Sequence, residues 1–188
     1  MAEPSPFLVI VDPQVIFAAD GSDWQSPFWA DAEPNILRLA DAFGERVVVT
    51  RWLPTADRST SWGDYFEAWP FADVPADDPL YDLLPGFEDL SPHPTVDEPT
   101  FGKWHQQLRG IVGDAPEVVV AGVSTDCCVI STVLPAADAG ARITVVADAC
   151  AASTAENGAA AMHVMGLYPP QVQITSTATV LASRATTT

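Results

Sequence analysis

Four uninterrupted runs of mainly β-branched residues constrain the fold of this chain more than any other feature. They span residues 7–11, 46–50, 117–121 and 142–147, and a weaker fifth run spans residues 171–175. A strand with one solvent-facing side alternates polar and apolar residues, whereas a strand that is covered on both faces does not. The runs therefore predict a sheet with parallel strands and with both faces buried.

Helical patterns separate these runs. The first four patterns each end just before a glycine, the residue preferred just past a helix C-terminus. The expected helices span residues 33–43, 103–112, 126–139, 154–165 and 176–183. This alternation predicts one α/β domain over residues 1–188, with three layers (α/β/α) and a mostly parallel, doubly wound, Rossmann-like sheet.

A long segment over residues 52–100 interrupts the alternation and is rich in proline, aspartate and aromatic residues. A connection of this length inside one domain is usually functional. We expect short helices at residues 62–69 and 80–84. We also expect most of the aromatic rings to pack the segment onto the sheet, while one or two of them line a pocket.

The composition excludes several classes of partner. The formal net charge of −17 repels nucleic acid and anionic membranes. No apolar run approaches the roughly 20 residues of a membrane span, and residues 7–11 are too short for a signal peptide, so we expect a cytoplasmic protein. Three cysteines, two of them adjacent, do not suit a disulfide framework.

Reactive residue types follow three of the predicted strands. Asp12 ends the first strand, Arg51 and Trp52 end the second, and Cys127 and Cys128 follow the third long one. Ligands of an open parallel sheet bind at the carboxyl ends of its strands. A thiol in the first turn of a helix is stabilised as thiolate, and a carboxylate can act as its base and acid. Simple packing of the cysteines and a turn role for Asp12 remain alternatives.

Four motifs carry a resemblance to a known family. They are Asp12-Pro-Gln14, Val48-Val-Thr-Arg51, Gly122-Val-Ser-Thr-Asp-Cys-Cys-Val-Ile-Ser-Thr132, and Ala137-Asp-Ala-Gly140 followed by Val145-Val-Ala-Asp-Ala149. Through them the chain resembles the isochorismatase-like cysteine hydrolases over nearly all of its 188 residues.

The resemblance implies a catalytic arrangement. Cys128, directly before valine, would be the nucleophile, and Cys127 would hold a variable position beside the substrate. A cis peptide would join Val123 to Ser124, and the backbone N–H groups of Ser124 and Cys128 would form an oxyanion hole. Asp12 would be base and acid. Homodimers or homotetramers are also implied.

The chain departs from the family at the lysine that completes the catalytic group. The alignment places Glu98 where relatives have lysine, yet Lys103, the only lysine in the chain, lies five residues away. Either Lys103 reaches back to supply the positive charge, or Glu98 occupies the site and suppresses the thiolate. We favour Lys103.

We predict no metal and no cofactor, because the three histidines, His93, His105 and His163, lack ligand spacing. Arg51 could clamp a substrate carboxylate, although pairing with a nearby aspartate is the simpler expectation. The remaining candidates for substrate contacts are Gln14, which would hold the first loop by hydrogen bonds, and the pocket-wall residues Phe17, Trp29, Trp62 and Trp104.

These features favour a metal-independent cysteine hydrolase that cleaves the C–N bond of a small-molecule amide through a thioester. One alternative is vinyl-ether hydrolysis of the isochorismatase type, which needs an acid and no nucleophile. The other is a non-catalytic relative that binds a ligand, motivated by Glu98.

Overall fold

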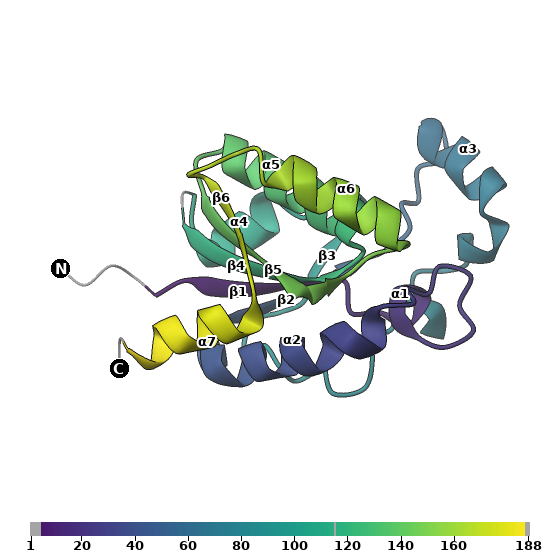
Figure 1. Cartoon of the computed structure of the whole chain (residues 1–188). Helices are drawn as coiled ribbons and strands as arrows, with labels where there is room; N and C mark the ends of the chain where they lie inside the picture. Colours follow the sequence, from purple (N-terminus) through teal and green to yellow (C-terminus); the bar gives the residue numbers. More distant parts are fainter. Residues whose placement is uncertain (1–4, 115, 187–188) are drawn as a thin grey trace.

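Six parallel strands form the central sheet of the computed structural model, which describes residues 5–114 and 116–186 (Figure 1). The order across the sheet is β3-β2-β1-β4-β5-β6. The strands are β1 (Phe7–Val11), β2 (Val47–Trp52), β3 (Val96–Glu98), β4 (Glu117–Val123), β5 (Arg142–Ala151) and β6 (Val172–Thr175). The change of direction in strand order falls at β1 and β4, where a ligand site is expected in a sheet of this kind.

Helices cover both faces of the sheet (Figure 1). One face carries α2 (Trp29–Phe43) and α7 (Thr177–Ala185), and the other carries α4 (Gln106–Val112), α5 (Ile130–Asp138) and α6 (Ala155–Met165). Successive side chains of a strand point to opposite faces. Leu8 and Ile10 accordingly join the core beneath α2, while Val9 and Val11 join the core beneath α5. The prediction of a parallel α/β sheet buried on both faces is confirmed.

Two secondary-structure predictions were wrong, one for a strand and one for a helix. β3 was missed because its three residues contain a single apolar side chain, Val96, beside Asp97 and Glu98. The helix expected at residues 80–84 is a 3-10 turn at Pro79–Tyr81. The helix expected at residues 126–139 is present as a π-helical turn, Thr125–Val129, that continues into α5.

Two short helices, α1 (Val15–Ala18) and, within the 52–100 segment, α3 (Ser61–Ala68), lie beyond the carboxyl ends of the strands (Figure 1). The same segment then returns to the start of β2, where the Ser91 hydroxyl donates to the Val47 carbonyl, before it enters β3. The Trp52 ring stacks on Phe66, with 6.0 Å between ring centroids, and meets Tyr81 edge-on at 5.7 Å. Aromatic burial of this kind anchors the segment to the sheet. Within the described residues, the fold contains no helix with the length and hydropathy needed to span a membrane.

Candidate active site

Asp12 lies at the end of β1, where the chain turns sharply. Its backbone φ is 47°, in the left-handed region that aspartate tolerates better than most residues, and its side chain is fully buried. Thr50 on the neighbouring β2 makes two hydrogen bonds with Asp12. The Thr50 hydroxyl donates to Asp12 Oδ1 at 2.7 Å, and the Asp12 N–H donates to Thr50 Oγ1 at 3.2 Å. The second carboxylate oxygen, Oδ2, accepts no hydrogen bond in the structure.

Lys103 brings the compensating charge. Its Nζ lies 3.1 Å from Asp12 Oδ2, and neither side chain has any exposed surface. Nζ also donates to the Thr100 carbonyl at 2.8 Å, and the Lys103 N–H donates to Thr132 Oγ1 at 3.0 Å. A buried charge is tolerated when it is paired and hydrogen-bonded, so these contacts fix the lysine as firmly as the carboxylate.

The turn after β4 presents Cys128. Gly122 has a φ of 123°, and a Cβ at that position would lie 2.2 Å from the Val11 carbonyl oxygen, so only glycine permits the two strand ends to come this close. The next peptide, Val123–Ser124, is cis, as the resemblance implied. The π-helical turn then buries the Cys128 side chain almost completely.

The surroundings of the Cys128 thiol disfavour its thiolate form. The Cys127 thiol, the loss of solvent and the Asp12 carboxylate raise the pKa of Cys128 well above its ordinary value, against the opposing effect of Lys103. A hydrogen bond with Cys128 lowers the pKa of Cys127. This direction opposes the expected stabilisation of a thiolate by the helix N-terminus, because burial beside a carboxylate acts against the charged form.

A cavity of about 240 Å³ opens onto this cysteine. Four aromatic side chains form much of its wall, and the rest is polar. The lining residues are Phe17, Asp23, Trp24, Gln25, Tyr65, Phe101, Ser124, Asp126, Cys127, Cys128 and Ser153. Burial raises the pKa of Tyr65, so its phenol stays neutral. The cavity is the place where a small molecule can meet the Cys128 sulfur.

The predicted site residues divide into two groups. Phe17, Ser124, Cys127 and Cys128 line the cavity, with Asp12 and Lys103 fully buried. The others make different contacts. Gln14 donates to the carbonyls of Trp52 and Tyr81 and accepts from the Trp52 N–H, which ties β1 to the aromatic segment.

The remaining candidates lie away from the cavity lining. Trp29 packs against Phe87, with 5.7 Å between ring centroids, and Trp104 joins the core beneath α4. Trp62 packs behind Phe101 at 5.0 Å.

Arg51 and Glu98 also lie outside the cavity lining. Arg51 forms a two-pronged ion pair with Asp97, at 2.9 and 2.8 Å. Glu98, on β3, lines a surface depression beside His105 and α4.

Sequence reasoning missed several residues of the cavity wall, namely Asp23, Trp24, Gln25, Tyr65, Phe101, Asp126 and Ser153. The aromatic richness of the 52–100 segment was the signal for Tyr65. Trp24 belongs to the connection between α1 and α2, where no periodic pattern reveals the direction of a side chain.

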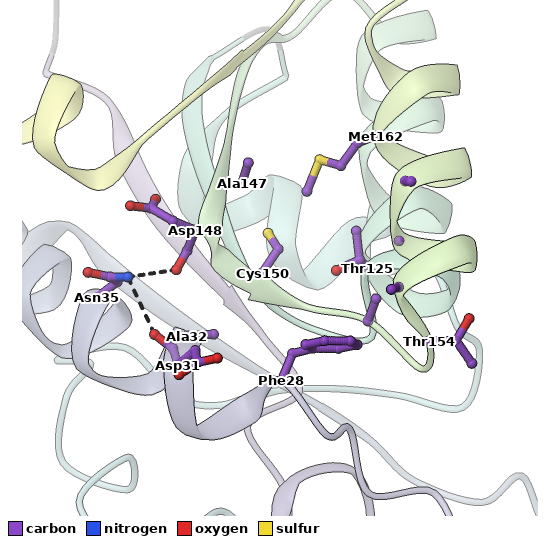
Figure 2. Close-up of a pocket in the computed structure, with 14 residues that line it drawn as sticks. Phe28, Asp31, Ala32, Asn35, Thr125, Ala147, Asp148, Cys150, Thr154 and Met162 are labelled. Atoms are coloured by element: carbon purple, nitrogen blue, oxygen red, sulfur yellow. Dashed lines mark hydrogen bonds between the residues drawn. The ribbon is translucent and has the colours of Figure 1, made fainter.

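A second cavity, of about 340 Å³, lies between α2, β5 and α6 (Figure 2). Cys150 and Thr125 line it, and burial raises the pKa of Cys150 to about 12. Cys128 lines the smaller cavity and not this one, so the smaller cavity is the candidate site. Among residues 5–114 and 116–186, no three His, Cys, Asp or Glu side chains gather as a metal site.

Comparisons with known proteins agree with this architecture. The model of the isochorismatase domain matches residues 6–179. A cysteine hydrolase from Pseudomonas syringae pv. phaseolicola superposes with a TM-score of 0.79 at 19% identity, covering 100% of both chains.

Two further solved structures are similar. A putative isochorismatase hydrolase from Oleispira antarctica has a TM-score of 0.75 at 18% identity, covering 97% of this chain and 98% of its own. A nicotinamidase/pyrazinamidase from Bacillus subtilis has a TM-score of 0.72 at 20% identity, covering 92% of this chain and 100% of its own. No curated protein sequence matches the chain.

Proposed function

Because the chain belongs to the isochorismatase-domain family, a family of hydrolases, we propose that it is a cysteine hydrolase that cleaves the C–N bond of a small amide. The observation that carries this proposal is the buried Asp12–Lys103 ion pair, 3.1 Å long, next to a cysteine that opens onto a cavity. A base, a nucleophile and an access route are the parts that amide hydrolysis through a thioester needs.

In the first half of the reaction, Asp12 takes the proton of the Cys128 thiol as the sulfur attacks the amide carbonyl. The raised pKa of Cys128 favours proton transfer that accompanies the attack. The backbone N–H groups of Ser124 and Cys128 are the proposed donors to the resulting oxyanion. Asp12 then gives the proton to the departing nitrogen, the C–N bond breaks, and ammonia or an amine leaves a thioester on Cys128.

In the second half, Asp12 takes a proton from water, the hydroxyl adds to the thioester carbonyl, and the C–S bond breaks. The proton returns to the sulfur, and the carboxylic acid is released. Lys103 compensates the carboxylate charge while the pair is shielded from water, so that Asp12 can exchange a proton in a buried place.

The placement of Glu98 supports the catalytic interpretation over a non-catalytic one. A site in which a second carboxylate suppresses the Cys128 thiolate would require Glu98 to lie beside Asp12. That side chain instead lies beside α4, and the lysine ammonium is the group that contacts Asp12.

The test is ammonia release from a panel of small primary amides. We expect the wild-type chain to hydrolyse at least one of them, and Cys128→Ser and Asp12→Asn each to lower kcat by about a thousandfold or more. The matched control is Cys150→Ser, because Cys150 lines the other cavity. Undiminished amide hydrolysis by Cys128→Ala would contradict the thioester route and would fit an acid-catalysed reaction instead.

A further inference from the structure

The wall of the active-site cavity contains a continuous set of aromatic rings. The Trp24 ring stacks on Phe17 with 6.1 Å between centroids and meets Tyr65 at 5.9 Å. Tyr65 in turn meets Phe101 edge-on at 5.6 Å. Trp24, Tyr65 and Phe101 are only partly buried, so ring surface remains open to a molecule in the cavity.

The charges around these rings have one sign. Asp23 and Asp126 line the cavity, and among its described lining residues there is no lysine, arginine or histidine. The Asp126 carboxylate is held in place by Ser153, whose N–H and hydroxyl donate to it at 2.8 and 2.5 Å. A carboxylate-bearing substrate would therefore meet two negative charges and no partner.

Cations at this end of the sheet are already engaged in ion pairs. Lys103 is fully buried and paired with Asp12, and both prongs of the Arg51 guanidinium are engaged by Asp97. The net charge of −17 adds a long-range field that attracts cations and repels anions. Aromatic faces flanked by carboxylates are the surroundings that bind alkylated ammonium groups.

We propose that the substrate of this cavity is a small amide carrying an alkylated ammonium group, which the rings of Trp24, Tyr65 and Phe101 hold beside Asp23. The inference rests on the proposed amide hydrolysis for the reacting end of the molecule, while the ammonium end is argued from the cavity wall alone. The cavity, of about 240 Å³, has room for a small molecule of this kind.

Two amides of nearly equal shape test the charge preference, and a smaller anionic amide completes the series. They are trimethylglycinamide, its neutral carbon analogue 3,3-dimethylbutanamide, and the anionic monoamide of malonic acid. We expect kcat/KM for the cationic amide to exceed that of the neutral one by about tenfold or more, and the anionic one to be the poorest. A neutral or anionic amide hydrolysed as fast as the cationic one overturns the proposal.

Substitutions in the cavity wall test whether these residues cause the preference for the cationic amide. Asp23→Asn should lower the cationic-to-neutral ratio by about fivefold, the effect of one exposed charge pair, and Tyr65→Leu should lower it as well. Asp31→Asn is the matched control, because it removes the same charge from the other cavity (Figure 2). An equal fall in the ratio for Asp31→Asn would mean that overall charge, and not this wall, sets the preference, which also overturns the proposal.

A binding measurement separates this inference from the proposed reaction. Choline and its neutral analogue 3,3-dimethylbutan-1-ol are titrated into the wild-type protein by calorimetry. Choline binding about tenfold tighter, and lost in Tyr65→Leu, supports the cation site even where no amide is hydrolysed, in which case only the proposed reaction fails. Equal affinities, or no choline binding at millimolar concentration, overturn the cation site.

Discussion

Asp12 and Lys103 depend on each other because neither has contact with water. Removing one partner of such a pair leaves a buried, uncompensated charge, whereas removing both charges leaves none. Thr50 and Thr100 supply the remaining hydrogen bonds to the pair, so the arrangement has little freedom to relax.

Lys103→Met should therefore destabilise the protein by about 3–5 kcal/mol in denaturant unfolding. Adding Asp12→Asn, which removes the second charge and keeps a residue that tolerates the left-handed backbone, should recover part of that loss, although both proteins should be inactive. The control is Arg109→Met, which breaks the exposed pair with Asp114 and should cost less than about 1 kcal/mol. Equal losses of unfolding free energy for Lys103→Met and Arg109→Met would mean that the buried pair contributes no more to stability than the exposed pair.

The three cysteines should react with iodoacetamide at different rates. Cys127 is half-buried with a lowered pKa, so at about pH 7 it should label faster than an ordinary thiol. Cys128 and Cys150 have raised pKa values, so each should label slowly until the pH passes well above the ordinary thiol range. Peptide mass mapping across a pH series gives the three rates. Rapid labelling of Cys128 in the free protein would contradict the raised pKa.

At the scale of elements, the position of Lys103 depends on how closely its loop approaches α5. A Cβ on Gly102 would lie 2.4 Å from the Ser131 carbonyl oxygen. Pro135, four residues after Ser131, has no N–H to offer that carbonyl, so the helix leaves room on this side for another chain segment. Gly102 occupies the room, and Lys103 then reaches Asp12.

Gly102→Ala should thus move the loop away from α5 and lower kcat with little change in overall fold. Gly110→Ala in α4 is the matched control, since nothing lies within 4 Å of a Cβ at that position, and it should be neutral or slightly stabilising. Circular dichroism reports the fold and ammonia release reports kcat. Unchanged kcat in Gly102→Ala would show that the loop tolerates the shift.

At the scale of the whole molecule, 25 acidic residues oppose 8 lysines and arginines. Self-repulsion of a net charge of −17 destabilises the compact state, and salt screens it. We expect Tm at neutral pH to rise as NaCl is raised from low to moderate concentration. A falling Tm over the same range would indicate that the ion pairs outweigh the repulsion.

The layers of the fold and the position of the turn that carries Cys128 could be predicted because both depend on local sequence, on apolar runs and on one motif. The sequence left the choice between Lys103 and Glu98 open, since that choice depends on the contact between Gly102 and Ser131, residues 29 positions apart. The cavity wall escaped prediction for a similar reason: Trp24 and Tyr65 come from connections without periodicity and meet only in the folded chain.

The rings that face the substrate and the groups proposed to carry out the chemistry belong to separate parts of the chain. Asp12 and Cys128 are fixed at strand ends, whereas Trp24 and Tyr65 stand on the α1–α2 connection and on α3. Gln14 clamps the base of the aromatic segment without entering the cavity. The segments that would contact the substrate can therefore be replaced separately from the strand ends. New sequences in the α1–α2 connection and in α3 are a route to a changed substrate preference with Asp12 and Cys128 left in place.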